Sequence, residues 1–363
     1  MTFTYTASDG RRFRVRRQAV IPCVLCAAAL LFGSCARQVL PPQTTLVMNT
    51  VCTINLFEAG TQELYDTIAQ RLTEIDAAFN AHDPASLLSA VNAAAGTAPV
   101  RVNGDLLAVI EAALSFARLT GGAFDPSIGP LVRLWNIGSE HPRVPAPHET
   151  AAAAQLVNYQ NVIVDRAAGT VFLTQKGMSL DLGGIAKGYA ADEIVRILKQ
   201  AQVPSALIDL GGNIYAYGKK AGGAPWKIGI KNPFDTSATP AAALSAVNKT
   251  IVTSGVYERY FIEDGVRYHH LIDPHTGYPA QNGTVSVTIA ADSSLNADAL
   301  STAVFILGAQ KGFELLSSAF PDTGAAIITD DRRIYMNQPF LDLLDHVSPE
   351  FAREPPQNQA HAR

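Results

Sequence analysis

"KTIVTSGVYERYFIEDGVRYHHLIDP" spans residues 249–274 and does most to decide the fold class. Its β-branched and aromatic residues form two runs on either side of Asp264-Gly265, and such a dipeptide predicts an antiparallel hairpin. We expect residues 254–259 to lie on one strand and residues 266–272 on its partner. An antiparallel hairpin needs no crossover helix, so this stretch argues against a regular βαβ arrangement.

The rest of the chain mixes helical and strand-like segments without regular alternation. Apolar residues at helical spacing predict helices over residues 61–80, 104–122, 185–201 and 293–308. Runs with strand composition predict strands within residues 46–59, 161–182, 205–218, 226–233, 283–291 and 325–337. This order predicts an α+β fold with mixed or antiparallel sheets and packed helices. The string DLGG occurs at 181–184 and again at 209–212, which points to a possible internal duplication.

Composition and charge limit the classes of protein that fit. The 363 residues, 48% of them hydrophobic, suffice for one large domain or two modest ones. The net charge is -4, and the body of the chain has no block rich in lysine and arginine. Nucleic acid is therefore not an expected partner.

The N-terminus has the pattern of a targeting segment. Five arginines lie between residues 11 and 17, and the apolar run 19–33 that follows is too short to span a bilayer. Small residues precede Cys35 in "LFGSC", which resembles a bacterial lipobox, where the cysteine is lipidated. Ordinary secretion with an unmodified Cys35 is the alternative. Cys52 is then the only cysteine of the mature body, so no intramolecular disulfide is expected there.

These features predict four regions and a location. We expect a signal peptide over 1–34, the lipidated cysteine with a Pro-bearing tether over 35–45, a folded domain over 46–345 and a disordered tail over 346–363. The protein would be exported and held by its lipid on the periplasmic face of the bacterial inner membrane.

The stretch "SLDLGGIAKGYAADEI", residues 179–194, predicts a strand, a glycine turn and the start of a helix. Paired glycines let a ligand approach the backbone, and free N–H groups at a helix start attract phosphate. Lys187 could add a cation. The stretch matches neither a Walker A loop nor a Rossmann fingerprint. A tight turn with a solvated lysine is the alternative.

"NADALSTA", residues 296–303, places Asp298 and Thr302 on one helix face. A carboxylate with a hydroxyl suits a hard cation such as Mg²⁺, and the Gly184 carbonyl could complete the ligand set. The alternative is a helix cap, since serine, asparagine and aspartate favour that position.

Two further segments carry candidate groups. In "GGAFDPSIGPLVRLWNIG", residues 121–138, Phe124 and Trp135 could stack on a flat ring, or could simply be core aromatics. In "HHLIDPHTG", residues 269–277, His270 could transfer protons at neutral pH, and Asp273 could orient it. Adjacent strand residues face opposite ways, so a metal site formed by both histidines is not expected.

In combination these segments resemble the ApbE family of bacterial flavin-transferring lipoproteins. The resemblance runs from about residue 47 to 337 and rests on motifs in the family's order: "FDPSIGPLVRLW", "DLGGIAKGYAAD", "IDLGGNIYAYG", "TSGVYERYF", "HHLIDPHTGYP" and "ADALSTAVFILG". It implies a T-fold-like α+β architecture. It also implies an enzyme that uses Mg²⁺ to cleave FAD, attaches FMN by a phosphoester to a threonine or serine of an acceptor protein, and releases AMP.

The resemblance also assigns residues. It implies His270 as the catalytic base beside Asp273, and Asp298, Thr302 and the Gly184 carbonyl as metal ligands. The implied FAD contacts are Met48, Asn55, Ala123, Phe124, Asp125, Asp181, Lys187, Ser254 and Ile272. The implied acceptor is an exported or membrane redox subunit with the motif Asp-x-x-Ser/Thr-Gly-Ala-Ser/Thr.

Two departures from the family pattern leave alternatives open. Asn49 stands where the family has glycine, which puts the local backbone path in question. Asn55 stands where an aromatic residue is expected in members that hold FAD tightly, which favours turnover, including hydrolysis. An FAD pyrophosphatase that yields FMN and AMP is one alternative, and an FAD-storing lipoprotein is another. A storage protein would not need a metal beside the pyrophosphate.

Overall fold

The computed structural model describes residues 3–6, 10, 12–15, 39–235 and 239–355, and it divides into the units Met1–Val39 and Leu40–Arg363. In the first unit, β1 (Phe3–Thr6) and β2 (Arg12–Val15) form an antiparallel hairpin. Cys35 and the whole apolar run 19–33 of the predicted signal peptide lie outside the described residues, so those two predictions stay predictions.

The second unit alternates helices and strands irregularly, as an α+β chain should. Its α-helices are α2 (Gln62–Phe79), α3 (Leu87–Ala93), α4 (Gly104–Leu119), α5 (Gly129–Trp135), α6 (Pro147–Ala154), α7 (Ala186–Gln200), α8 (Ser294–Ala319) and α9 (Gln338–Leu341). Its strands are β3 (Gln43–Val47), β4 (Thr50–Asn55), β5 (Val100–Arg101), β6 (Val162–Asp165), β7 (Thr170–Leu173), β8 (Ser205–Leu210), β9 (Asn213–Gly218), β10 (Trp226–Ile230), β11 (Ala242–Ala246), β12 (Lys249–Gly255), β13 (Tyr260–Glu263), β14 (Val266–His269), β15 (Thr284–Ala291), β16 (Gly324–Thr329), β17 (Arg333–Met336), β18 (Leu344–Val347) and β19 (Ala352–Arg353).

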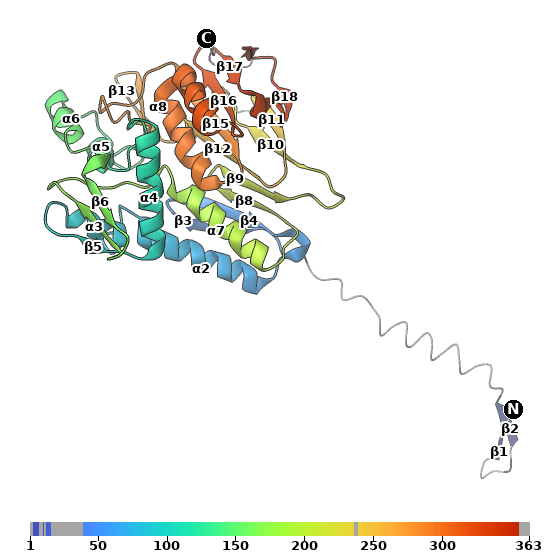
Figure 1. The fold of residues 1–363 in the computed structure, drawn as a ribbon. Helices are drawn as coiled ribbons and strands as arrows, with labels where there is room; N and C mark the ends of the chain where they lie inside the picture. The colour runs from blue at the N-terminus through green and yellow to red at the C-terminus, as the bar shows by residue number, and fades with distance from the viewer. Residues whose placement is uncertain (1–2, 7–9, 11, 16–38, 236–238, 356–363) are drawn as a thin grey trace. The chain divides into compact units, whose positions relative to one another are not determined.

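A nine-stranded sheet is the centre of this unit (Figure 1). Its strand order is β19-β17-β16-β15-β12-β9-β8-β4-β3, and every pairing is antiparallel except β17 with β19. Strand β12 lies between β9 and β15, with Ile251 opposite Ile214 on one side and Ala290 on the other. The predicted α+β fold with a large mixed sheet is confirmed.

The two faces of the sheet bury different cores. Helices α2, α7 and α8 lie on one face, and the largest apolar core fills the space between them and the sheet. A second core lies on the other face and includes residues of the small sheet β10-β11-β18. Strand β15 is buried along its whole length because it faces both cores.

Helix α8 is a core helix that passes beneath the sheet next to α7. It begins after Ser293, whose side chain accepts the Asn296 N–H, and its backbone breaks from helical geometry at Gly308. Its 26 residues are apolar enough by composition to cross a membrane. More than half of that apolar window is buried inside the protein, as is usual for a core helix.

The predicted strand over 46–59 is wrong in its continuity. The segment forms a hairpin, β3–β4, whose two-residue turn is Met48-Asn49 with φ of 55° and 54°. Both residues therefore adopt the left-handed conformation that a type I′ turn requires, and asparagine tolerates this conformation better than most residues. Because Gln43 already pairs with Ile54, the predicted tether over 35–45 ends before residue 43.

Two other boundaries also differ from prediction. Residues 249–274 contain three strands, because β12 joins the large sheet and only β13 and β14 form the hairpin around Asp264-Gly265. Ser254 therefore pairs with Val287 and not with the histidine strand. The predicted disordered tail is wrong up to residue 355, because β18 and β19 cover this segment and Phe351 is buried. Residues 356–363 lie outside the described residues.

The close approach of α7 and α8 depends on Gly188. A β-carbon there would lie 2.2 Å from the Ser294 carbonyl oxygen, so the helices would have to separate. We expect Gly188→Ala to lower the free energy of unfolding by about 1–3 kcal/mol, the usual cost of overpacking. Gly104→Ala is the matched control, since a β-carbon at Gly104 meets nothing within 4 Å. Urea unfolding that gives equal stabilities for the two variants would refute this packing argument.

Candidate functional site

Two hydrogen bonds of Asp181 fix the glycine turn that precedes α7. The Asp181 carboxylate accepts the Gly183 N–H at 2.8 Å, which shapes the turn. The Asp181 N–H in turn donates to the Pro126 carbonyl at 2.8 Å, which ties this turn to the 121–127 loop. The second DLGG string forms the β8–β9 hairpin turn instead of a helix entry, so the two strings do not have the same structure.

Asp298, a residue of α8, lies against the start of α7, directly after this glycine turn. Its side chain is only 5% exposed, and its Oδ2 accepts the Gly188 N–H at 2.9 Å. Lys187 Nζ lies 3.3 Å from Oδ1 and also donates to the Gly183 carbonyl at 3.2 Å. Ser293, not Asp298, caps α8, so the helix-cap alternative does not account for Asp298. The carboxylate instead joins the start of α7 to α8.

Thr302 and Gly184 adjoin this carboxylate and provide further oxygen atoms. Thr302 lies one helical turn after Asp298, and its Oγ1 would lie 3.3 Å from a β-carbon at Gly184. Among the described residues the Thr302 hydroxyl has no hydrogen-bond partner. One carboxylate, one free hydroxyl and one carbonyl form a donor set that fits Mg²⁺, a cation that keeps several waters. In the described part of the chain no three His, Cys, Asp or Glu side chains group as metal ligands.

The 121–127 loop forms the neighbouring wall. Phe124 and Ala123 are buried, and a β-carbon at Gly184 would lie 3.1 Å from the Phe124 ring. Burial raises the pKa of the Asp125 carboxyl, although that group accepts hydrogen bonds from Ser127 and from the Tyr159 N–H. The Asp125 side chain therefore secures the loop, and Phe124 is the residue of this loop that faces the glycine turn.

His270 has a defined tautomer. Its Nδ1 lies 3.2 Å from the Arg259 carbonyl oxygen, which can only accept, so Nδ1 carries the proton and Nε2 has the free lone pair. Burial and, to a smaller extent, the nearby charges of Arg259, His269 and Lys187 together lower the pKa of His270 to about 3. The effect of Lys187 places His270 within electrostatic range of the Asp298 cluster. His269 points into the core against Phe305.

Asp273 was predicted to orient His270, but no hydrogen bond joins the two among the described residues. The chain bends at residues 270–272 instead of continuing as a strand. The Asp273 carboxylate accepts the His275 N–H at 2.9 Å and lies 3.2 Å from His275 Nδ1. His275 Nε2 lies 3.2 Å from the Gly121 carbonyl, so this histidine links the 269–277 loop to the 121–127 loop. His275 is a site residue that was not predicted from the sequence. Its position two residues after Asp273, in a Pro-bearing turn, is the signal that could have revealed it.

Arg259 connects a third segment to His270. Its carbonyl also accepts the His270 N–H at 3.1 Å, and its guanidinium donates to the Asn49 carbonyl at 3.3 Å. The β3–β4 turn with Met48 is thereby placed near the histidine loop. The left-handed Asn49 preserves a conformation that glycine adopts readily, so the question about the backbone path at this position is resolved.

Three of the predicted FAD contacts, namely Ser254, Ile272 and Asn55, have other surroundings. The Ser301 hydroxyl donates to the Asp298 carbonyl, so the Ser254 hydroxyl donates to the Ser301 oxygen and supports α8. Ile272 is buried against Leu131 and Trp135. Asn55 ends β4, at the opposite end of the strand from the Met48-Asn49 turn, and accepts the Phe57 N–H. The other predicted site residues lie on segments that hydrogen bonds and close contacts join to one another.

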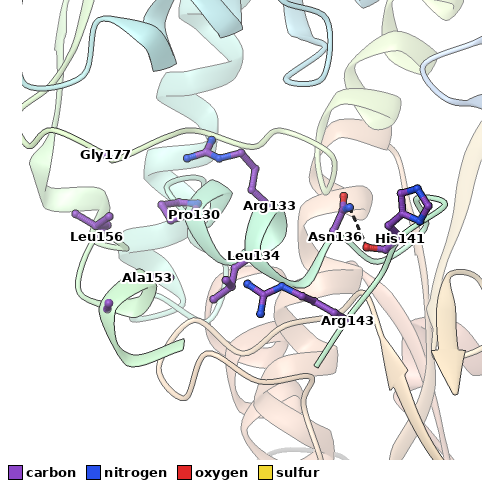
Figure 2. Close-up of a pocket in the computed structure, with 10 residues that line it drawn as sticks. Pro130, Arg133, Leu134, Asn136, His141, Arg143, Ala153, Leu156 and Gly177 are labelled. Carbon is purple, nitrogen blue, oxygen red and sulfur yellow. Dashed lines mark hydrogen bonds between the residues drawn. The ribbon is translucent and has the colours of Figure 1, made fainter. Parts of the chain in front are cut away.

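An open groove of about 480 Å³ lies beside this cluster and not within it (Figure 2). It is lined by α5, α6 and the segments that flank them. The opposite side of α5 carries Leu131 and Trp135, which back the histidine loop, and the Trp135 indole donates to the Gly277 carbonyl at 2.8 Å. The lining residues are Pro130, Arg133, Leu134, Asn136, His141, Arg143, Ala152, Ala153, Leu156 and Gly177.

Fold and site together define an α+β protein in which a glycine turn adjoins a buried carboxylate, and the lysine that pairs with this carboxylate also acts electrostatically on a neutral histidine. The comparison with protein families agrees: the model of the ApbE family matches residues 48–327. The chain belongs to the ApbE family, and the resemblance seen in the sequence is confirmed.

Individual relatives extend over most of the chain. A FAD:protein FMN transferase of Treponema pallidum (strain Nichols) is 39% identical over 362 residues, which is 93% of this chain and 98% of the relative. A FAD:protein FMN transferase of Klebsiella pneumoniae (strain 342) is 41% identical over 249 residues, 69% of this chain and 77% of the relative.

Solved structures share the fold. The crystal structure of the ApbE protein from Thermotoga maritima has a TM-score of 0.76 at 32% identity and covers 84% of this chain and 99% of that one. The flavin transferase ApbE from Vibrio cholerae has a TM-score of 0.75 at 27% identity with the same coverage.

The low pKa values of the two adjacent histidines predict a pH-dependent stability. In the unfolded chain both would titrate near 6.5, whereas burial lowers the folded pKa of His269 to about 4 and that of His270 to about 3. Below pH 6.5 the unfolded state therefore binds more protons, so the free energy of unfolding falls as the pH drops from 7 towards 4.

Urea unfolding across this pH range tests the prediction, with His270→Gln as the comparison. Carboxylates contribute equally to both proteins, so the variant should lose less stability on acidification. Identical losses in the two proteins would contradict the assignment of His270 as a neutral, buried base.

Proposed function

We propose that the chain is a FAD:protein FMN transferase that uses Mg²⁺. The curated relatives carry this activity in their names, and they align with most of the chain. The observation that carries the proposal for this chain is Asp298. Its side chain is 5% exposed, and among the described residues its carboxylate pairs with one lysine and one helix-start N–H. A carboxylate buried in this way costs stability unless it serves a ligand.

Asp298, Thr302 and the Gly184 carbonyl would hold the metal ion. Mg²⁺ at this place would neutralise the charge that develops on the FAD pyrophosphate. Lys187 would then turn from Asp298 to a phosphate oxygen, which is within reach because its Nζ already bonds the glycine turn at Gly183. Phe124, at the edge of that turn, offers an apolar surface beside the nucleotide.

The reaction needs one proton transfer that His270 can perform. The acceptor hydroxyl oxygen attacks the phosphorus of the FMN half, the bond from that phosphorus to the bridging oxygen breaks, and AMP departs with this oxygen. The hydroxyl proton passes to His270 Nε2, the nitrogen that the Arg259 contact leaves free. His270 is neutral across the physiological range, so this lone pair is free, but the burial that lowers its pKa also weakens it as a base. The anionic pyrophosphate bound beside it would raise this pKa and so let it accept the proton.

The remaining expectations are part of the same proposal. The acceptor would be an exported redox protein with the motif Asp-x-x-Ser/Thr-Gly-Ala-Ser/Thr, and a lipid on Cys35 would hold the enzyme at the periplasmic face of the inner membrane. Asp273 would act on the loop through His275 and not on the base.

Hydrolysis of FAD is a second candidate activity. The resemblance to the family favours it, since an aromatic residue is expected at the position of Asn55 in members that hold FAD tightly, and an amide offers little stacking surface. In the structure Asn55 lies at the end of β4 that is opposite the Met48-Asn49 turn. Water would then replace the acceptor hydroxyl, with FMN and AMP as products. Both activities need the same metal ligands and the same base.

Asp298→Asn and His270→Gln test the two roles. With FAD, Mg²⁺ and a peptide that carries the acceptor motif, we expect Asp298→Asn to abolish transfer, since it removes the only carboxylate of the ligand set. His270→Gln should lower the rate about 10²–10⁴-fold, the usual contribution of a general base. Mass spectrometry follows AMP release and the added mass of FMN on the peptide.

Controls separate this proposal from its rivals. Ser254→Ala removes a hydroxyl that only supports α8 and should keep most activity. AMP and free FMN with an unmodified peptide would favour the hydrolase. Intact FAD that stays bound with or without EDTA would favour storage and overturn the metal assignment.

The variant Asn55→Tyr tests whether Asn55 weakens FAD binding and so favours turnover, including hydrolysis. We expect tighter FAD binding, by about tenfold for one added aromatic contact, and slower release of FMN and AMP. Equilibrium dialysis with FAD and a product assay measure the two quantities. Unchanged affinity together with unchanged turnover would show that Asn55 is not an FAD contact.

A further inference from the structure

The exposed hairpin β13–β14 leads directly into the proposed base. Strand β14 ends at His269, so His270 is the next residue of the chain. In the described part of the chain neither β13 nor β14 pairs with a third strand. Three of the eight large hydrophobic side chains that the described residues expose are on this hairpin: Tyr260 at 42%, Ile262 at 61% and Val266 at 43%.

The hairpin has a packed face and a free face. Phe261 and Tyr268 stack on each other, and Tyr268 packs against Trp135 in the small core of α5. Tyr260 and Ile262 alternate with Phe261 and therefore point the other way. Arg267 lies opposite Ile262 on this face, and its guanidinium is 4.5 Å from the centre of the Tyr260 ring. A face with exposed apolar side chains that is rigidly backed and next to a reactive group is typical of a protein-binding surface.

The open groove of Figure 2, which is lined in part by arginine side chains, adjoins this face of the hairpin. The segment 137–144 lies between them: Ile137 and Val144 pack in the same small core as Phe261 and Tyr268, and a β-carbon at Gly138 would lie 3.4 Å from Arg259. On the far side of this segment the groove carries Arg133, His141 and Arg143.

The charges in the groove indicate what it can bind. Arg143 forms a bidentate ion pair with Glu149. The Arg133 guanidinium has neither an ion pair nor a hydrogen bond among the described residues. Partial burial lowers its pKa, and the charge of the nearby Asp181 carboxylate partly offsets this. An unpaired guanidinium in a groove, within a chain of net charge -4, suits a carboxylate of the partner.

We propose that the hairpin β13–β14 and the adjoining groove form the docking surface for the acceptor polypeptide, which contacts Tyr260 and Ile262 with apolar side chains and Arg133 with an acidic one. This inference rests on the proposed function, since that activity requires a polypeptide hydroxyl at His270. The surface would supply affinity for the acceptor and leave the binding of FAD unchanged.

A pair of peptides tests the proposal on the full chain. One carries only the acceptor motif, and the other extends the motif on both sides with alternating leucine and aspartate. With the wild-type protein, FAD and Mg²⁺, we expect the extended peptide to have a KM about three- to tenfold lower. Added salt should reduce this advantage.

Variants test whether the lower KM of the extended peptide depends on the proposed docking surface. Ile262→Ser and Arg133→Gln should each remove most of it without changing the Kd for FAD, whereas Ile163→Ser, a matched exposed residue of β6, should keep it. If the two surface variants retain the wild-type difference in KM, or if the wild type modifies both peptides equally well, the docking proposal is overturned. A wild type that modifies neither peptide overturns the proposed function and this inference together.

Discussion

The contact between the Asp298 carboxylate and the first turn of α7 is the constraint on which the site depends. A buried carboxylate must be paired, and here the pair consists of a backbone N–H at a helix start and the Lys187 ammonium. Both partners can be shared with a ligand, because a cation or a phosphate at this place would satisfy the same groups. Gly188 makes the contact feasible, since any larger residue would push α8 away.

The remaining elements bring loops to this contact. The large sheet supports α7 and α8 on one face, and the segments before α7, after β14 and after α4 meet beside their ends. Single hydrogen bonds then fix the loops to one another: Asp181 to Pro126, His275 to Gly121, and Arg259 to both His270 and Asn49. The site is therefore assembled from short polar ties on a rigid apolar base, and no single motif contains it.

Much of the fold and the site could be predicted from the sequence, for physical reasons. Helices with a strong apolar period, such as α2 and α7, match their predicted ranges closely because the period reflects burial. The strand errors come from turns without glycine or proline, such as Met48-Asn49, where side-chain chemistry did not mark the reversal. The structure brings Asp298, Thr302 and Gly184 together, and their role as metal ligands stays a prediction. The partner of His270 was not predicted, because a backbone carbonyl leaves no trace in a sequence.

The most direct measurement is a crystal structure of the full chain with FAD and Mg²⁺ in slow-turnover conditions. The account predicts metal density bonded to Asp298 and Thr302, the pyrophosphate over the Gly183-Gly184 turn, Lys187 turned from Asp298 towards a phosphate oxygen, and His270 Nε2 facing the phosphorus. FAD bound elsewhere, with the Lys187–Asp298 pair intact and no metal at Thr302, would contradict the claim that this contact is the centre of the chemistry.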